Sequence, residues 1–97
     1  MDVNIKSIHF DATEKLQDFI IKKINRLARH NESISNAEVT LKVVKPETSM
    51  NKEAGTKISV PQQDDIFASK VANSFEEAVD LSIEALERQL EKIKGRK

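Results

Sequence analysis

Residues 74–94 read SFEEAVDLSIEALERQLEKIK, and this stretch decides what the rest of the chain must do. Ser74 and Glu77 form an S-x-x-E capping box, which is a typical start of a helix. Beyond it, apolar residues recur every three or four positions. The pattern predicts a helix over about 75–94, closed by Gly95, with one apolar stripe that must be buried against another element.

A second stretch with the same period lies near the N-terminus. Its apolar residues fall on one helical face: Leu16, Phe19, Ile20, Ile24 and Leu27. Asp11 or Thr13 can cap this helix, since both side chains accept hydrogen bonds from a free helix end. We therefore expect a helix over about 12–30, with a break at 31–33.

Four shorter segments alternate apolar and polar residues, as half-buried strands do. They cover about 2–7, 37–45, 56–60 and 66–71. Pro46 ends the second segment, because proline cannot donate to a strand ladder. We expect a polar hairpin loop over 47–53 and a turn over 62–65.

The predicted order is β-α-β-β-β-α, and the fold class is α+β. Each helix carries one apolar stripe, so the economical solution is a four-stranded sheet with both helices packed on one face. A chain of 97 residues has enough length for one modest core. We therefore expect a single domain over 1–97.

The composition excludes several classes of protein. No apolar run approaches the roughly 18 residues of a membrane span, and the N-terminus lacks the pattern of a signal peptide. Cysteine is absent, which excludes disulfides and thiolate chemistry. We expect a cytoplasmic protein without a membrane partner.

Catalytic patterns are also missing. His9 and His30 are far apart, and the adjacent acids at 64–65 and 76–77 lack the opposed geometry of a general acid and base. The two glycines of the chain cannot build a phosphate-binding loop. We therefore expect no enzyme, no metal, no cofactor and no small-molecule substrate.

The formal net charge is zero, from sixteen acids and sixteen bases, which argues mildly against a nucleic-acid partner. The arrangement is uneven, however. Bases gather toward the C-terminal end of both predicted helices and lie off the apolar stripes: Lys22, Lys23, Arg26 and Arg29, then Arg88, Lys92, Lys94, Arg96 and Lys97. Lys42 adds charge nearby if its strand lies beneath the outer ends of the helices.

Two interpretations of these bases remain open. Bases at a helix C-terminus complement the macrodipole, which needs no partner. Alternatively, antiparallel or oblique packing of the helices on one sheet brings both clusters onto one cationic surface.

Double-stranded-RNA-binding domains share the α-β-β-β-α order of this chain after residue 12. Those domains offer phosphate a basic start of their last helix. Glu76, Glu77 and Asp80 would repel phosphate there, which argues against ordinary duplex recognition. Phe67 alone does not make a stacking platform for single-stranded bases.

Three segments in this element order carry a family resemblance. They are LKVVK at 41–45, IFAS at 66–69 and LERQLEKIK at 86–94. Together they resemble the ribosome hibernation-promoting factors, also labelled ribosome-associated inhibitors or sigma-54 modulation proteins. The similarity covers essentially the whole chain and points to the short type of this family.

The resemblance implies binding to the small ribosomal subunit, through ribosomal RNA and ribosomal proteins. The family occupies the cleft between head and body, where it obstructs messenger and transfer RNA. Carried over by position, the contacts are Lys23, Arg26, Lys42, Arg88, Lys92 and Lys94. The charge pattern of this chain adds Lys22, Arg29, Arg96 and Lys97. We expect a monomer when the protein is free.

An alternative of another class is a protein-interaction module. Such a module, for example a regulator that binds a transcription factor, would use the charged helix ends to hold a protein partner.

Overall fold

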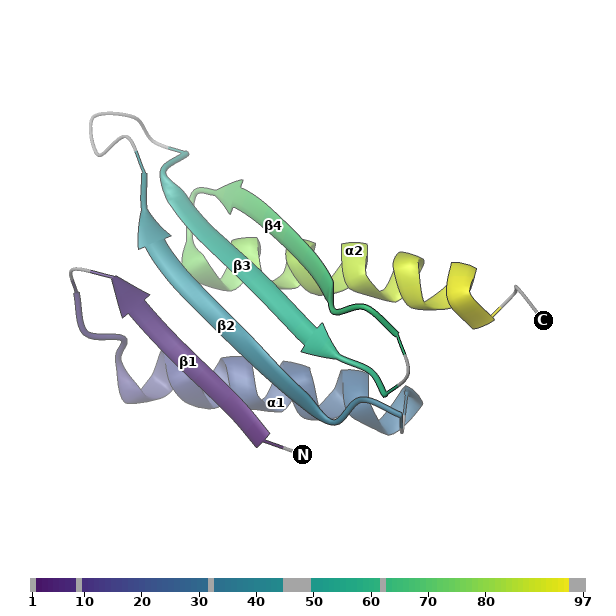
Figure 1. The fold of residues 1–97 in the computed structure, drawn as a ribbon. Coiled ribbons are helices and arrows are strands. Elements are labelled where there is room, and N and C mark those ends of the chain that lie inside the picture. The colour runs from purple at the N-terminus through teal and green to yellow at the C-terminus, as the bar shows by residue number, and fades with distance from the viewer. Residues whose placement is uncertain (1, 9, 32, 45–49, 62, 95–97) are drawn as a thin grey trace.

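The computed structural model describes residues 2–8, 10–31, 33–44, 50–61 and 63–94, with the backbone alone at 93 and 94. Six elements follow one another: β1 (Asp2–Ile8), α1 (Glu14–His30), β2 (Asn36–Val43), β3 (Lys52–Ser59), β4 (Ile66–Ala72) and α2 (Phe75–Lys94). This is the predicted order, and the α+β class is confirmed. Figure 1 shows the strands side by side in one layer, with both helices behind it.

The direction of the strands sets the direction of the helices. The sheet keeps the chain order β1-β2-β3-β4, with β1 parallel to β2 and the two following pairs antiparallel. β4 therefore points the same way as β1. Each of these strands is followed by a helix that runs back along the sheet, so α1 and α2 lie side by side and run in the same direction (Figure 1). Antiparallel or oblique packing, which one of the two interpretations of the bases required, is therefore not what the helices adopt.

The core lies between one face of the sheet and the two helical stripes. In the middle of the sheet, the register aligns Ile5, Val39, Thr56 and Ala68 in one row across the four strands. The predicted stripes are buried against this face: Leu16, Ile20, Ile24 and Leu27 on α1, and Val79, Ile83, Leu86 and Leu90 on α2. Burial of such side chains stabilises the fold by about 1.5–3 kcal/mol each, so the core holds both helices firmly in place.

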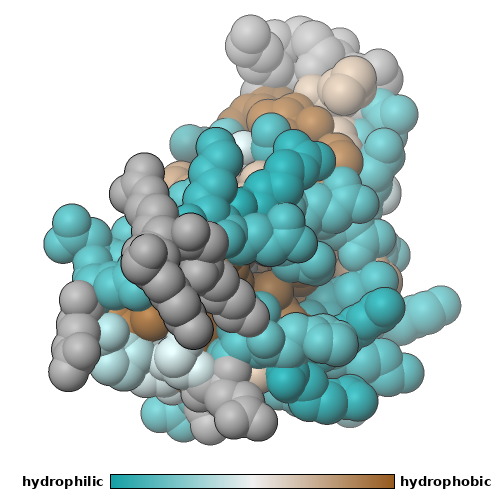
Figure 2. Space-filling model, turned by 90° about the vertical axis from the view of Figure 1, so that its right-hand side faces the viewer, coloured by the Kyte–Doolittle hydropathy of each residue, from teal (hydrophilic) through white to brown (hydrophobic). Residues whose placement is uncertain are grey.

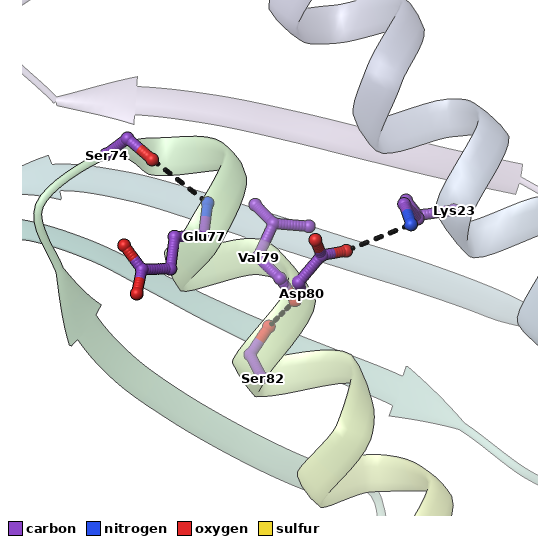
Figure 3. Close-up of polar contacts among 6 residues, drawn as sticks. All are labelled: Lys23, Ser74, Glu77, Val79, Asp80 and Ser82. Atoms are coloured by element: carbon purple, nitrogen blue, oxygen red, sulfur yellow. Dashed lines mark hydrogen bonds and ion pairs between the residues drawn. The ribbon is translucent and has the colours of Figure 1, made fainter.

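Local contacts fix where the helices begin. The Thr13 hydroxyl accepts a hydrogen bond from the amide of Leu16 at 3.1 Å, so Thr13 is the cap of α1. The Ser74 hydroxyl accepts from the amide of Glu77 at 3.2 Å, as the capping box predicts (Figure 3). The rings of Phe10 and Phe75 stack with centroids 4.9 Å apart. This stack joins the loop before α1 to the first turn of α2.

The largest difference from the predicted elements lies at β3. The strand begins at Lys52, inside the segment 47–53 that we expected to be loop. The antiparallel register pairs Val43 with Lys52, and this pairing extends the strand into a polar stretch. Residues 47–49 of that segment, together with Lys45 and Pro46, lie outside the described residues.

None of the helices that the structure describes combines the length and the apolar character that crossing a membrane requires.

Candidate functional site

A groove of about 600 Å³ runs between α1 and α2 on the outer side of the helical layer. Ten residues line it: Lys23, Arg26, Leu27, His30 and Asn31 from α1 and its cap, and Asp80, Ile83, Glu84, Glu87 and Glu91 from α2. Because the two helices run in the same direction, the residue numbers on both sides of the groove increase toward the same end. The groove therefore has one wall from each helix along its whole length.

The two walls carry opposite charge. Lys23, Arg26 and His30 are spaced by three and four residues, which keeps them on one side of α1. On α2 the same spacing aligns four carboxylates, which we call the acidic wall: Asp80, Glu84, Glu87 and Glu91.

The floor between the walls is partly apolar. Leu27 is 3% exposed and Ile83 is 6% exposed, so only their edges reach the groove. Asn31, at the end of α1, is buried and donates its side-chain amide to the carbonyl of Leu27 at 3.0 Å. This bond uses a polar side chain to close the last turn of the helix.

An ion pair between described residues crosses the groove. The Lys23 Nζ lies 3.2 Å from a carboxylate oxygen of Asp80, and Figure 3 shows the two side chains extending toward each other from α1 and α2. The same ammonium group lies 5.4 Å from the centroid of the Phe19 ring. Both side chains of the pair are only partly exposed, so Lys23 has less freedom than an ordinary surface lysine.

The other three carboxylates of the acidic wall are not neutralised by ion pairs with described side chains of the protein. Among the described residues, Glu84, Glu87 and Glu91 form no ion pair. The four carboxylates also outnumber the two fully cationic side chains of the groove, Lys23 and Arg26. In the described ranges, no group of His, Asp and Glu side chains is arranged to hold a metal ion.

Other bases lie outside the groove in two strips. The first, the α1 strip, consists of Lys15, Lys22 and Arg29, which are spaced seven residues apart and exposed. The second, the α2 strip, consists of Arg88 and Lys92, which are one turn apart and exposed. None of these five side chains lines the groove. Gln89 marks the side on which Lys92 lies, because its side-chain amide donates to the carbonyl of Phe67 on β4 at 3.2 Å.

The structure thus separates the predicted site into groups. Lys22 and Arg29 lie in the α1 strip, Arg88 and Lys92 in the α2 strip, and Lys23 and Arg26 in the groove that separates them. The side chain of Lys94 and all of Arg96 and Lys97 lie outside the described residues. Figure 2 shows the end of the molecule where both helices terminate, and hydrophilic side chains cover most of its described part.

Lys42 is not brought together with the helical bases. On β2 the buried residues are Ala37, Val39 and Leu41, so Lys42 projects from the opposite face of the sheet. Its neighbours there are Ile8 on β1 and Glu53 on β3. Lys42 pairs with Ile8, the last residue of β1, so it lies at the end of the sheet where the helices begin (Figure 1). Its strand therefore does not bring Lys42 beneath the basic ends of the helices.

Sequence reasoning missed two features of this surface. Lys15 belongs to the α1 strip because it precedes Lys22 by seven residues, just as Lys22 precedes Arg29. This spacing can be seen in the sequence. The acidic wall follows likewise from the intervals of four, three and four between its members. Its position beside the bases of α1 depends on the parallel packing of the helices, which no local pattern reveals.

The fold and this surface define a class of protein: a small α+β domain whose sheet supports two parallel helices that present a patterned charged face. The family described as sigma 54 modulation protein / S30EA ribosomal protein matches residues 3–97. The chain belongs to this family, as the resemblance predicted.

Named relatives agree with this assignment. A protein of Pseudomonas putida called ribosome hibernation promoting factor is 30% identical over 98 residues, with 97% of this chain and 87% of the relative covered. A protein of the same name from Azotobacter vinelandii is 31% identical, with 97% and 83% covered. A ribosomal subunit interface protein from Coxiella burnetii has the same fold, with a TM-score of 0.86, 23% identity and coverage of 99% and 100%.

Proposed function

We propose that this protein is a ribosome-binding hibernation factor. It occupies the decoding cleft of the small subunit and blocks messenger and transfer RNA sterically, in the cytoplasm. No bond is made or broken in this mechanism, so the protein needs no catalytic residue and no cofactor. The chain acts as one ribosome-binding domain and is monomeric when free.

The observation that carries the proposal is the shared direction of α1 and α2. Both helices end at the same end of the molecule (Figure 1), so their basic C-terminal halves lie on one side of the sheet. The macrodipole favours bases at the C-terminal end of each helix separately, and the parallel packing of the helices brings the two basic ends to one side of the sheet. Family membership and the names of the relatives point to the ribosome as the object of this surface.

A rigid support is the second requirement of a steric inhibitor. The buried stripes of both helices pack on the sheet, and the stacked rings of Phe10 and Phe75 join the loop before α1 to the first turn of α2. The backbone positions that carry the outward bases are therefore fixed without a partner. A preorganised backbone limits the loss of conformational entropy on binding to the side chains, which favours affinity.

Displacement of the ribosomal ligands tests the steric mechanism. Small subunits loaded with a short messenger and transfer RNA should release both when the protein is added in excess, and subunits loaded with the protein should not accept them. Fluorescent labels on the two RNAs measure the release. Simultaneous binding of the protein, the messenger and the transfer RNA would contradict the proposed location.

A protein partner is the second candidate, and the acidic wall is the observation that favours it. Carboxylates without ion pairs at Glu84, Glu87 and Glu91 suit a basic protein segment better than RNA. Ribonuclease treatment of the captured complex separates the two functions. A partner that remains bound after complete RNA digestion supports the protein-interaction module, whereas release supports ribosomal RNA.

A further inference from the structure

We propose that the outer edge of β4 is a docking site for an extended protein segment that pairs with β4 as a fifth strand. The segment turns apolar side chains toward the open face of the sheet, which is the face opposite the helices, and an acidic side chain toward the helical side. This surface is separate from the helical face, and the inference does not depend on ribosome binding.

β4 ends the sheet on one side, so half of its peptide groups have no neighbouring strand. The amide of Val44 donates to the carbonyl of Asn51 at 2.7 Å, so odd-numbered residues of β3 bond β2 and even-numbered residues bond β4. The register pairs even-numbered residues of β3 with even-numbered residues of β4. The amides and carbonyls of Phe67, Ser69 and Val71 therefore point outward, and together they form what we call the β4 edge.

A contact from α2 agrees with this orientation. The side-chain amide of Gln89 donates to the outward carbonyl of Phe67 at 3.2 Å. Further along the edge, residues 69–71 are exposed, and no described side chain bonds the peptide groups of Ser69 or Val71. The outward amide and carbonyl of each of these two residues can therefore pair with a further strand, as in the addition of a peptide to an open sheet edge.

The open-face side of the β4 edge suits apolar partners. Phe67 and Val71 project to this face and are 56% and 36% exposed. The Phe67 ring lies across Gly55, where an added Cβ atom would come within 3.0 Å of the ring. The absence of a side chain at Gly55 thus gives the ring its place on the sheet. Apolar side chains of an added strand opposite Phe67 and Val71 would cover both.

The helical side of the β4 edge carries a positive charge. Lys70 alternates with Ala68 and Ala72, which are buried on this side, but Lys70 itself is exposed. Among the described residues, Lys70 forms no ion pair. An acidic side chain opposite Lys70 in an added strand would supply the counter-charge. Because Asp64 and Asp65 precede β4, this acidic position belongs at the middle of the edge and not at its start.

Lys70 also argues against a second copy of this chain as the occupant. Two β4 edges that pair antiparallel about Ser69 bring both Lys70 side chains to one face, at diagonal positions about 7–8 Å apart. Pairing about Lys70 places the two ammonium groups directly opposite each other, which is destabilising. Lysine on an edge strand is a common means by which proteins avoid pairing with themselves. The same lysine attracts an acidic strand.

β1 forms the other edge of the sheet and serves as an internal control. The middle of β1 shows Asn4 and Lys6 on the open face, where β4 shows apolar residues. The Nζ of Lys6 lies 3.8 Å from a carboxylate oxygen of Glu38, so this charge already has a partner. The segment that fits β4 should therefore not bind at β1.

Short capped peptides test the proposal on the isotope-labelled full chain. One peptide alternates valine and glutamate, and the other alternates valine and lysine. The glutamate peptide should shift the NMR amide signals of Ser69 and Val71 and leave that of Ile5 on β1 unchanged. It should also bind more than about tenfold tighter than the lysine peptide, because one charge pair at about 4 Å in water changes affinity by about fivefold in either direction.

Reversal of the charge on the edge should reverse this preference. Lys70→Glu should lower the affinity for the glutamate peptide by about tenfold and raise that for the lysine peptide by a similar factor. The gain shows that the variant is folded, so the loss cannot come from unfolding. Lys15→Glu makes the same charge change at an exposed position on α1 and should alter each affinity by less than about threefold.

Four results would overturn the inference. Equal affinity of the wild type for the two peptides would remove the role of Lys70, and shifts centred on β1 or on the groove would place the segment elsewhere. Shifts of Ser69 and Val71 that grow with protein concentration, without peptide, would show that the edge takes a second copy. No shift at about 1 mM peptide would show that the edge does not bind a strand. None of these outcomes bears on the proposed function, because no ribosome is present.

Discussion

Two buried hydroxyl groups join α2 to the middle of the sheet. Thr56 on β3 and Ser82 on α2 are both fully buried, and their oxygens lie 2.9 Å apart. The Ser82 hydroxyl donates to the carbonyl of Val79 at 2.8 Å, as Figure 3 shows, so its proton is not available for Thr56. Thr56 is therefore the donor and Ser82 the acceptor of the bond between the two elements.

Ser82→Ala should lower the free energy of unfolding by about 1–3 kcal/mol, because it leaves the Thr56 hydroxyl buried without an acceptor. Thr56→Val in the Ser82→Ala background should cost much less than it does alone, since both polar groups are then gone. Urea denaturation of the two single variants and the double variant measures this coupling. Strictly additive losses would show that the hydroxyls are independent.

The helices as elements were the most predictable part of the structure. Their boundaries follow from caps and from the apolar period, which are local signals, and α2 covers Phe75–Lys94 as expected. The start of β3 at Lys52 was not predictable in this way, because it depends on pairing with Val43 on another strand. The neighbours of each base on the surface likewise follow from helix packing and not from sequence position.

Removing a cap tests the local part of this account. Thr13→Ala and Ser74→Ala should each lower the free energy of unfolding by about 1 kcal/mol, because an amide of the first turn loses its partner. Ser33→Ala, at an exposed turn position outside both helices, serves as the control and should change it by less than about 0.5 kcal/mol. Thermal unfolding followed by circular dichroism measures all three. Equal effects at the caps and at the control would contradict the assigned role.

For the molecule as a whole, the parallel direction of α1 and α2 decides which charges become neighbours. It gathers both basic C-terminal halves on the helical side, whereas the alternation of side chains along β2 puts Lys42 on the far side of the sheet. The separation of the bases into a groove and two strips could not be predicted from the sequence, because it needs the direction and rotation of both helices. The central claim is that this helical side binds ribosomal RNA.

Co-sedimentation of the protein with small ribosomal subunits across a salt series tests that claim most directly. If about six phosphates are neutralised, affinity should fall roughly a thousandfold between about 50 and 200 mM salt. Arg88→Gln/Lys92→Gln should weaken binding and flatten this dependence, whereas Lys6→Gln/Lys57→Gln, an equal charge change at exposed positions on the open face of the sheet, should not. A wild-type affinity that does not change with salt, or equal losses of affinity in both variants, would contradict the central claim.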